Sequence, residues 1–373
     1  MQSGEERAEA GAEPADAGEH AATGGGGPAG VPGTRRARID DVARLAGVSV
    51  ATVSRALRDL PNVAAGTRHR VHEAASALGY KADPNASRLA SGRTRTVGLV
   101  APLFDRWYAS TLVAGIERVL SAADYDLLIL SVEDPSCRHD FFERSDAFQS
   151  RVDGLVLVDF FVEPGYRRML ERLRVPVVTI GERIDPHPGL SVDNHLGARL
   201  AAEHLIQLGH TRIGVISGHV VAGHESPVPG ARMAGFREAM GAAGLAFSDE
   251  LVADGEFTMQ GGELAMASLL AMGDPPTAVF CFSDEMAAGA LEAARSLGVA
   301  VPGDVSIVGF DDHDFAAAVG LTTVRQQVRI LGERGAGRLL AEMAEPGAGG
   351  PHEVCDVELV VRRTSGAVPV RVR

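Results

Sequence analysis

Cysteine, aromatic residues and long apolar runs are all scarce in this chain. Only three cysteines occur among 373 residues, at positions 137, 281 and 355, and no pair of them has metal-ligand spacing. Dispersed cysteines imply no disulfide framework, which is typical of a reducing cytoplasm. The sequence therefore predicts a cytoplasmic protein with no metal and no cofactor, and it offers no nucleophile–base pair that would indicate an enzyme.

The chain also lacks the segments that direct a protein to or through a membrane. No run of about 18 apolar residues is present, so no span is predicted. The first twenty residues are acidic and have no apolar stretch of the kind found in secretory signals. Residues 1–37 are rich in Ala, Gly, Glu and Pro, and we expect them to form a disordered tail.

Charge is distributed unevenly. From Arg35 to Arg95 there are 12 Lys or Arg residues against 5 Asp or Glu residues, a net charge of +7, although the whole chain has −13. The first 34 residues carry −5, which leaves −15 for residues 96–373. A basic segment within an acidic protein favours contact with the phosphates of a nucleic acid.

Within this basic segment, residues 39–57 read IDDVARLAGVSVATVSRAL and have the pattern of a helix-turn-helix. Gly47 suits the left-handed conformation that ends a helix, and Ser49 can cap the next one through its hydroxyl. The apolar residues of the first helix recur at three- and four-residue spacing: Ile39, Val42, Ala43 and Ala46.

The second helix is expected to bury Val53, Ala56 and Leu57. Its outer face then carries Val50, Ala51, Ser54, Arg55 and Arg58. Small side chains allow close approach to DNA, and an arginine can donate two hydrogen bonds to guanine. The alternative is an ordinary helical hairpin with a glycine turn. Spacing, cap and local charge together favour a DNA reader, with Arg55 as the residue for base specificity.

Two further helices are predicted before the chain changes character. One covers residues 67–78, ends at Gly79, and adds Val71, Ala74, Ala75 and Leu78 to a three-helix core. The other is a short helix from Pro84, capped by Asp83 and ended by Gly92. Two turns are marginal in isolation, so this second helix needs a partner.

From Thr96 onward, short apolar runs alternate with helical stretches, which predicts parallel sheets covered on both faces. Such sheets bind ligands beyond the carboxyl ends of their strands. The expected strands are residues 97–100, 126–131, 154–158, 177–180, 213–217, 278–282, 306–310 and a last one near 356–361. The expected helices are residues 108–123, 137–150, 164–174, 194–209, 230–243, 259–272, 284–298 and about 325–343.

Several segments taken together resemble the LacI family of transcription regulators over residues 38–365. The segments that carry the resemblance are DVARLAGVSVATVSRAL at 41–57, TRHRVHEAASALGY at 67–80, RTVGLV at 95–100, RVDGLVLV at 151–158, GARLAAEHLIQLGHTRIGVISG at 197–218, ARMAGF at 231–236, DEMAAGAL at 284–291, VPGDVSIVGFDD at 301–312 and LTTVRQ at 321–326.

The resemblance implies a small all-α helix-turn-helix headpiece followed by an α/β two-lobe domain, like a periplasmic binding protein, with parallel sheets. The domains expected on this basis are a tail at 1–37, the headpiece at 38–82, a hinge helix and linker at 83–95, the two-lobe domain at 96–365 and a second tail at 366–373. One lobe is expected to combine 96–192 with 325–350, and the other 193–321 with 355–365.

The function implied by the resemblance is a ligand-responsive repressor of carbohydrate genes, working as a homodimer on a pseudo-palindromic operator. The DNA-contacting residues implied are Ser49, Val50, Ala51, Thr52, Ser54, Arg55, Arg58, Asn62, Thr67, Ala86 and Leu89, with Leu89 wedged into the minor groove. A sugar effector is expected between the lobes, in contact with Trp107, Tyr108, Arg232, Phe257, Asp284 and Asp311.

The sequence departs from the family pattern at several positions. Arg38 and Ala64 stand where side chains usually cap helices, and Ser283 replaces an asparagine of the cleft. Other interpretations stay open: Leu89 as a linker residue, Trp107 as core, Arg232 as a surface residue, and Asp311 in a solvated loop. A purine or other metabolite is an alternative effector. The alternative function is a sugar-binding or sugar-modifying protein without regulatory DNA binding.

Overall fold

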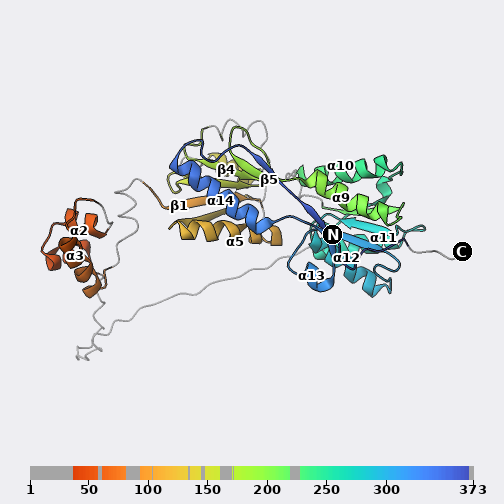
Figure 1. Cartoon of the computed structure of the whole chain (residues 1–373), viewed down its shortest axis with the longest axis horizontal. Coiled ribbons are helices and arrows are strands. Elements are labelled where there is room, and N and C mark those ends of the chain that lie inside the picture. The colour runs from red at the N-terminus through yellow and green to blue at the C-terminus, as the bar shows by residue number, and fades with distance from the viewer. Residues whose placement is uncertain are drawn as a thin grey trace, which may run out of the picture. The chain divides into compact units, whose positions relative to one another are not determined.

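A computed structural model of the chain describes residues 37–57, 61–80, 93–102, 104–132, 135–143, 148–159, 170, 172–218 and 227–368 (Figure 1). The chain divides into two compact units, Met1–Asp83 and Pro84–Arg373. Among the described residues, no helix is long and apolar enough to cross a membrane. The two units are described separately below.

The described part of the first unit is a bundle of three short helices. They are α1 (Ile39–Ala46), α2 (Val50–Leu57) and α3 (Ala65–Ala77). Their common core contains the residues predicted from helical periodicity, since Val42, Val53, Ala56 and Val71 are fully buried. The all-α character of this unit is therefore confirmed.

One predicted core residue of the headpiece was wrong. Leu78 is 37% exposed and lies outside the core cluster, whereas Tyr80 packs against it. The reason is the turn that follows α3. Leu78 is the C-cap residue of α3. Gly79 has a φ of 59°, and the Tyr80 amide donates to the Ala75 carbonyl at 2.8 Å. The chain thus folds back and brings the tyrosine, rather than the leucine, to the core.

The second unit contains two six-stranded sheets, each with helices on both faces. The first sheet has the strand order β11-β5-β4-β3-β1-β2 and is parallel throughout. Its strands are β1 (Thr96–Ala101), β2 (Asp126–Ser131), β3 (Gly154–Val158), β4 (Val177–Ile180), β5 (Gly189–Val192) and β11 (Glu353–Cys355).

Helices α5 (Trp107–Ala122) and α14 (Val328–Ala344) cover one face of this sheet and pack against each other. Helix α6 (Pro135–Glu143) contributes Phe141 to the core on the other face. This sheet and its helices are the first lobe (Figure 1).

The second sheet has the order β12-β10-β9-β8-β6-β7, and only the β10–β12 pair is antiparallel. Its strands are β6 (Ile213–Ser217), β7 (Val252–Asp254), β8 (Ala278–Cys281), β9 (Ser306–Asp311), β10 (Thr322–Arg325) and β12 (Glu358–Val360). Its helical elements are α9 (Asn194–Gln207), α10 (Pro227–Ala242), η1 (Asp249–Leu251), α11 (Met259–Leu270), α12 (Asp284–Ser296) and α13 (Ala316–Val319).

Helices α9 and α10 pack as one pair on this sheet, and α11 and α12 pack as another (Figure 1). One continuous apolar cluster, centred on Phe236, Phe280 and Phe310, joins them to the strands. This sheet and its helices are the second lobe.

Three connections join the lobes: β5 to α9, β10 to α14, and β11 to β12. Each connection leaves a strand of one lobe and continues in a helix or strand of the other lobe. The carboxyl ends of the central parallel strands therefore face the region between the lobes, where ligands bind in folds of this kind.

All eight apolar runs predicted as strands are strands, and the predicted two-lobe α/β class is confirmed. Four strands were not predicted, namely β5, β7, β10 and β11. The last helix begins at Val328 rather than near 325, because residues 322–325 pair in register with β9. The helix predicted at 164–174 falls mostly outside the described residues.

Candidate functional site

The turn between α1 and α2 has the geometry that its residues predict. Gly47 adopts a left-handed conformation with φ 65° and ends α1. Ser49 caps α2, because its Oγ accepts a hydrogen bond from the Thr52 amide at 3.2 Å. At the start of α1, Arg38 has no side-chain cap, and the Asp41 carboxylate accepts from the Arg38 amide at 3.0 Å instead. Ala64 likewise provides no side-chain cap for α3.

The outer face of α2 is available for a partner. Ser49, Val50, Ala51 and Arg55 are exposed, while Thr52 and Ser54 are half-buried. These are small, hydroxyl-bearing or cationic side chains on a single short helix. Because Val53 and Ala56 on the opposite face are fully buried, the orientation of α2 in the bundle is fixed.

The remaining residues expected to contact DNA divide into two groups. Asn62 is exposed and has a φ of 78°, and Thr67 is half-buried in the first turn of α3. Both lie in or directly after the α2–α3 connection. Arg58, Ala86 and Leu89 lie outside the described residues, as does the predicted short helix at 84–91.

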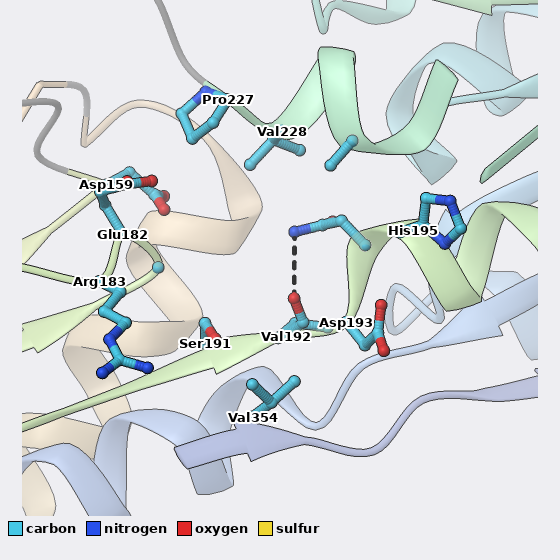
Figure 2. A pocket seen from close by; sticks show the side chains of 13 residues that line it. Asp159, Glu182, Arg183, Ser191, Val192, Asp193, His195, Pro227, Val228 and Val354 are labelled. Atoms are coloured by element: carbon cyan, nitrogen blue, oxygen red, sulfur yellow. Dashed lines mark hydrogen bonds between the residues drawn. The ribbon is translucent and has the colours of Figure 1, made fainter. Parts of the chain in front are cut away.

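A cavity of about 370 Å³ lies between the two lobes (Figure 2). Asp159 and Glu182, which follow β3 and β4, and Ser191 of β5 line it from the first lobe. The start of α9 and the first residues of α10 line it from the second lobe. Its volume falls within the usual range for small-molecule sites.

Arg232 of α10 lies behind this cavity wall and is 4% exposed. Its Nε donates to Asn194 Oδ1 at 2.8 Å, its Nη1 donates to the Phe282 carbonyl, and its guanidinium stacks on the Phe310 ring at 3.5 Å. Burial lowers the pKa of Arg232 to about 10, although the nearby Asp311 charge opposes this shift. Arg232 is therefore a buried cation fixed in position, not a surface residue.

Acidic side chains gather around this guanidinium. Burial raises the pKa of Asp311 to about 6 in spite of the Arg232 charge, and Asp311 also accepts a hydrogen bond from Gln326. Burial raises the pKa of Asp159 to about 7; Arg232 lowers it and Glu182 raises it further. Asp284 is fully buried and bonds to Thr323 Oγ1 at 2.6 Å and to the His313 amide at 2.8 Å.

The three aromatic residues expected at the effector have different surroundings. Tyr108 is half-buried, and burial raises its pKa, with further upward shifts from Asp159 and Asp311. Phe257 packs on Gly218, where an added Cβ would lie 2.0 Å from the ring. Trp107 stacks on His313 of the other lobe, with the ring centroids 4.5 Å apart.

Backbone strain is concentrated where strands end at the cleft. Non-glycine residues with positive φ occur directly after β3, after β7 and at the end of β9: Asp159, Glu256, Phe257, Asp311 and Asp312. Strained residues of this kind persist when surrounding structure fixes them, and they cluster at functional sites. Of these, the sequence pattern had not indicated Asp159, although its position directly after a predicted strand was a usable signal.

Among the described residues, no three His, Cys, Asp or Glu side chains are grouped so that they could hold a metal ion. The cavity is instead lined by separate polar groups and by apolar residues such as Val192 and Val354 (Figure 2). Asn194 Nδ2 donates to the Val192 carbonyl at 3.4 Å and ties the first turn of α9 to the connection from β5. This composition is that of a binding pocket for a small organic molecule.

Comparison with known proteins identifies both units. Residues 38–83 match the bacterial regulatory proteins of the lacI family, and residues 202–365 match a periplasmic binding protein-like domain. The HTH-type transcriptional repressor CytR of Escherichia coli strain K12 is 33% identical over 342 residues, covering 89% of this chain and 97% of that protein. The chain belongs to the LacI family.

Similarity to other LacI-family members supports this assignment. The regulator GalR of the same strain is 36% identical over 315 residues, covering 82% of this chain and 89% of GalR. A crystal structure of the lac repressor dimer, bound to operator and an anti-inducer, superimposes with a TM-score of 0.79 at 27% identity, covering 89% of this chain and all of that chain. These relatives are transcription regulators, so the chain is a DNA-binding regulator and not an enzyme, and the alternative of a sugar-modifying protein is set aside.

Proposed function

We propose that this LacI-family protein is a cytoplasmic repressor of carbohydrate genes that binds a pseudo-palindromic operator as a homodimer and responds to a sugar. The observation that carries the proposal is the exposed outer face of α2, set in a segment of net charge +7 within an acidic chain. Support for the sugar comes from a transcriptional regulator of known structure, 30% identical to this chain, that was solved as a complex with cellobiose.

In this proposal, α2 enters the major groove. The residues that contact DNA are Ser49, Val50, Ala51, Thr52, Ser54 and Arg55, with Arg58, Asn62 and Thr67 beside them. Ala86 and Leu89 of the hinge reach the minor groove, where an apolar side chain kinks DNA. Arg55 has a donor pattern that matches guanine O6 and N7. The domain boundaries given above, 38–82, 83–95 and 96–365, are part of the same proposal.

The effector is proposed to bind between the lobes, near Tyr108, Arg232, Phe257 and Asp311. Asp284 supports the site, because its two carboxylate oxygens hold Thr323 and the His313 backbone. A ligand that contacts both lobes changes their equilibrium arrangement and is thereby coupled to DNA binding, and such coupling is worth about 1–3 kcal/mol.

The test is a fluorescence anisotropy titration of genomic operator candidates with the full-length protein. Binding should be tighter for one palindromic sequence than for a shuffled duplex, and log affinity should fall linearly with log salt, with a slope that counts the phosphate contacts. Addition of sugars to the complex then reports the effector response. Equal affinity for every duplex at every salt concentration would refute the proposal.

A further inference from the structure

A single carboxylate, that of Asp153, holds the end of the predicted linker where it enters the first lobe. Asp153 Oδ1 accepts hydrogen bonds from the Thr94 amide at 2.6 Å and from the Thr94 hydroxyl at 2.9 Å. Its Oδ2 accepts from the Arg95 amide at 2.9 Å. Charge-assisted hydrogen bonds of this kind are shorter and stronger than those between neutral groups. Asp153 therefore fixes two consecutive residues that are distant from it in the sequence.

The same two-residue segment is held on its other side by the turn between α5 and β2. The Asp126 amide donates to the Arg95 carbonyl at 2.9 Å, and Arg95 Nη1 donates to the Ala123 carbonyl at 3.4 Å. The Arg95 guanidinium lies over the Tyr125 ring, 5.2 Å from its centre. Arg95 has a φ of 52°, in the left-handed region. A non-glycine residue keeps such a conformation where its surroundings fix it, and the contacts on both sides of Arg95 do so.

Asp153 stands directly before β3, a central strand of the first sheet. All five residues of β3 are buried, and the strand pairs with β1 on one side and with β4 on the other. Asp159, at the carboxyl end of β3, lines the cavity between the lobes. This strand thus has the cavity at one end and the linker at the other. A rigid-body displacement of the first lobe moves Thr94 and Arg95 with it, because Asp153 ties them to β3.

We propose that Asp153 is a positioning residue for operator binding. By fixing Thr94 and Arg95, it sets the point and the direction from which the chain continues to the headpiece. Without this carboxylate the two residues regain backbone freedom, which has to be given up again when the protein binds DNA. Fixing the backbone of one residue changes an equilibrium constant by about tenfold. This inference rests on the proposed function, because it requires a specific operator.

The experiment is a fluorescence anisotropy titration of the full-length protein with a duplex that the parent protein selects from a random pool. Asp153→Ala should weaken the binding of this duplex by about tenfold. Asp153→Asn keeps one oxygen for Thr94 but loses the acceptor for the Arg95 amide, so its affinity should lie between those of the parent and the alanine variant. Affinities equal to that of the parent, or higher, in both variants overturn the inference.

The charge of Asp153 makes the sign of the effect decisive. Each substitution removes a negative charge, and this change alone would strengthen binding to polyanionic DNA. The matched control is Asp304→Ala, which removes the same charge from the loop before β9, where Asp304 Oδ2 accepts from the Ala300 amide at 2.8 Å. This variant should bind the duplex at least as tightly as the parent. An equal loss of affinity in the control overturns the inference.

Two further measurements separate positioning from a general loss of the fold. In the Asp153→Ala variant, amide hydrogen exchange should accelerate in the peptide that contains Thr94 and Arg95 but not in peptides from β3 and β4. Acceleration throughout β3 and β4 assigns Asp153 to the stability of the lobe and overturns the inference. Thr94→Val removes only the hydroxyl donor and leaves Asp153 in place; it should weaken duplex binding by about threefold. Unchanged binding in this variant also counts against the proposed contact.

Failure of the inference and failure of the proposed function give different results. If the parent protein selects and binds a duplex but the Asp153 variants bind it equally well, the inference fails and the proposed function stands. If the parent protein binds no duplex in preference to a shuffled one, the proposed function fails, and the inference fails with it.

Discussion

Trp107 in the first lobe stacks on His313 in the second, with ring centroids 4.5 Å apart and an interplanar angle of 28°. The indole Nε1 also donates to Asp314 Oδ2 at 3.4 Å, and the Phe315 ring packs against His313 with the ring centroids 4.1 Å apart. The tryptophan that was expected to contact an effector therefore joins the two lobes directly.

Because the chain has one tryptophan, tryptophan emission reports the surroundings of this indole. We expect His313→Ala to shift the Trp107 emission to longer wavelength, since the indole gains contact with water. The stability cost should be about 1 kcal/mol, the usual size of an aromatic pair. His139→Ala, a change at an exposed residue of α6, is the control and should leave the emission unchanged. Identical spectra for both variants would contradict an indole held by His313.

The turn of the headpiece allows a test in which two similar substitutions have opposite effects. An added Cβ meets nothing within 4 Å at either Gly47 or Gly66, so packing is equal at the two sites. Gly47 has a left-handed φ of 65°, whereas Gly66 lies within α3. Gly47→Ala should destabilise the headpiece by about 1 kcal/mol, and Gly66→Ala should stabilise it by about 0.5 kcal/mol.

Amide hydrogen exchange of the α1–α3 peptides in the full-length protein measures both changes. Faster exchange in the Gly47 variant and slower exchange in the Gly66 variant are expected, because local opening follows local stability. A change of the same sign in both variants would show that conformational strain at Gly47 does not decide the stability of the turn.

Much of this fold could be predicted from the sequence, and the exceptions have physical reasons. The central strands are continuous apolar runs because helices cover both faces of each sheet. The missed strands β5 and β11 contain residues such as Ser191 and Glu353, and their extended conformation depends on the neighbouring strands that they join at the edge of a sheet. Local sequence holds little information about such edge pairing.

The residues of the candidate site also fall into those that local sequence indicates and those that it does not. Ser49 and Gly47 could be assigned from neighbours in sequence, because capping and helix termination are local. Asp159 and Glu182 were missed, since their proximity depends on the pairing of β3 with β4. The contact of Trp107 with His313 joins residues from different lobes and depends on the three connections between them. No periodicity within either segment indicates such a contact.

Arg55 is the side chain on which the proposed base specificity depends. It is exposed on α2, opposite the buried Val53 and Ala56. Arg55→Ala should lose about 1–3 kcal/mol of discrimination at one base pair of each half-site, because the bidentate contact with guanine is removed. The measurement is anisotropy with the operator and its single-base variants.

The matched control for that experiment is Arg44→Ala. Arg44 lies on α1, its side chain is 77% exposed, and it pairs with Asp41. Its removal takes away the same charge and should weaken binding evenly across sequences, if it weakens binding at all. A specificity profile for the Arg55 variant that matches the Arg44 variant would assign Arg55 to the phosphate backbone.

The raised pKa of Asp159 predicts a pH-dependent stability with a definite sign. Burial, opposed by Arg232 and reinforced by Glu182, raises the pKa to about 7 in the folded protein, from 3.8 for a free side chain. Between these two values the unfolded chain has lost the proton that the folded protein retains. The free energy of unfolding therefore falls as the pH rises from about 4 to about 7, and it changes no further from this group at higher pH.

Asp159→Asn removes this penalty, because an amide has no proton to lose in this range. In the absence of effector, the variant should be more stable than the parent protein at pH 8, by on the order of 2 kcal/mol, and nearly equal to it at pH 4. Asp249→Asn, at a side chain that is 80% exposed, should change the stability by less than about 0.5 kcal/mol at both pH values. Urea unfolding of the three proteins at pH 4, 6 and 8 measures the differences. An Asp159 variant whose advantage is the same at pH 4 and pH 8 would show that this carboxyl does not titrate between them in the folded protein.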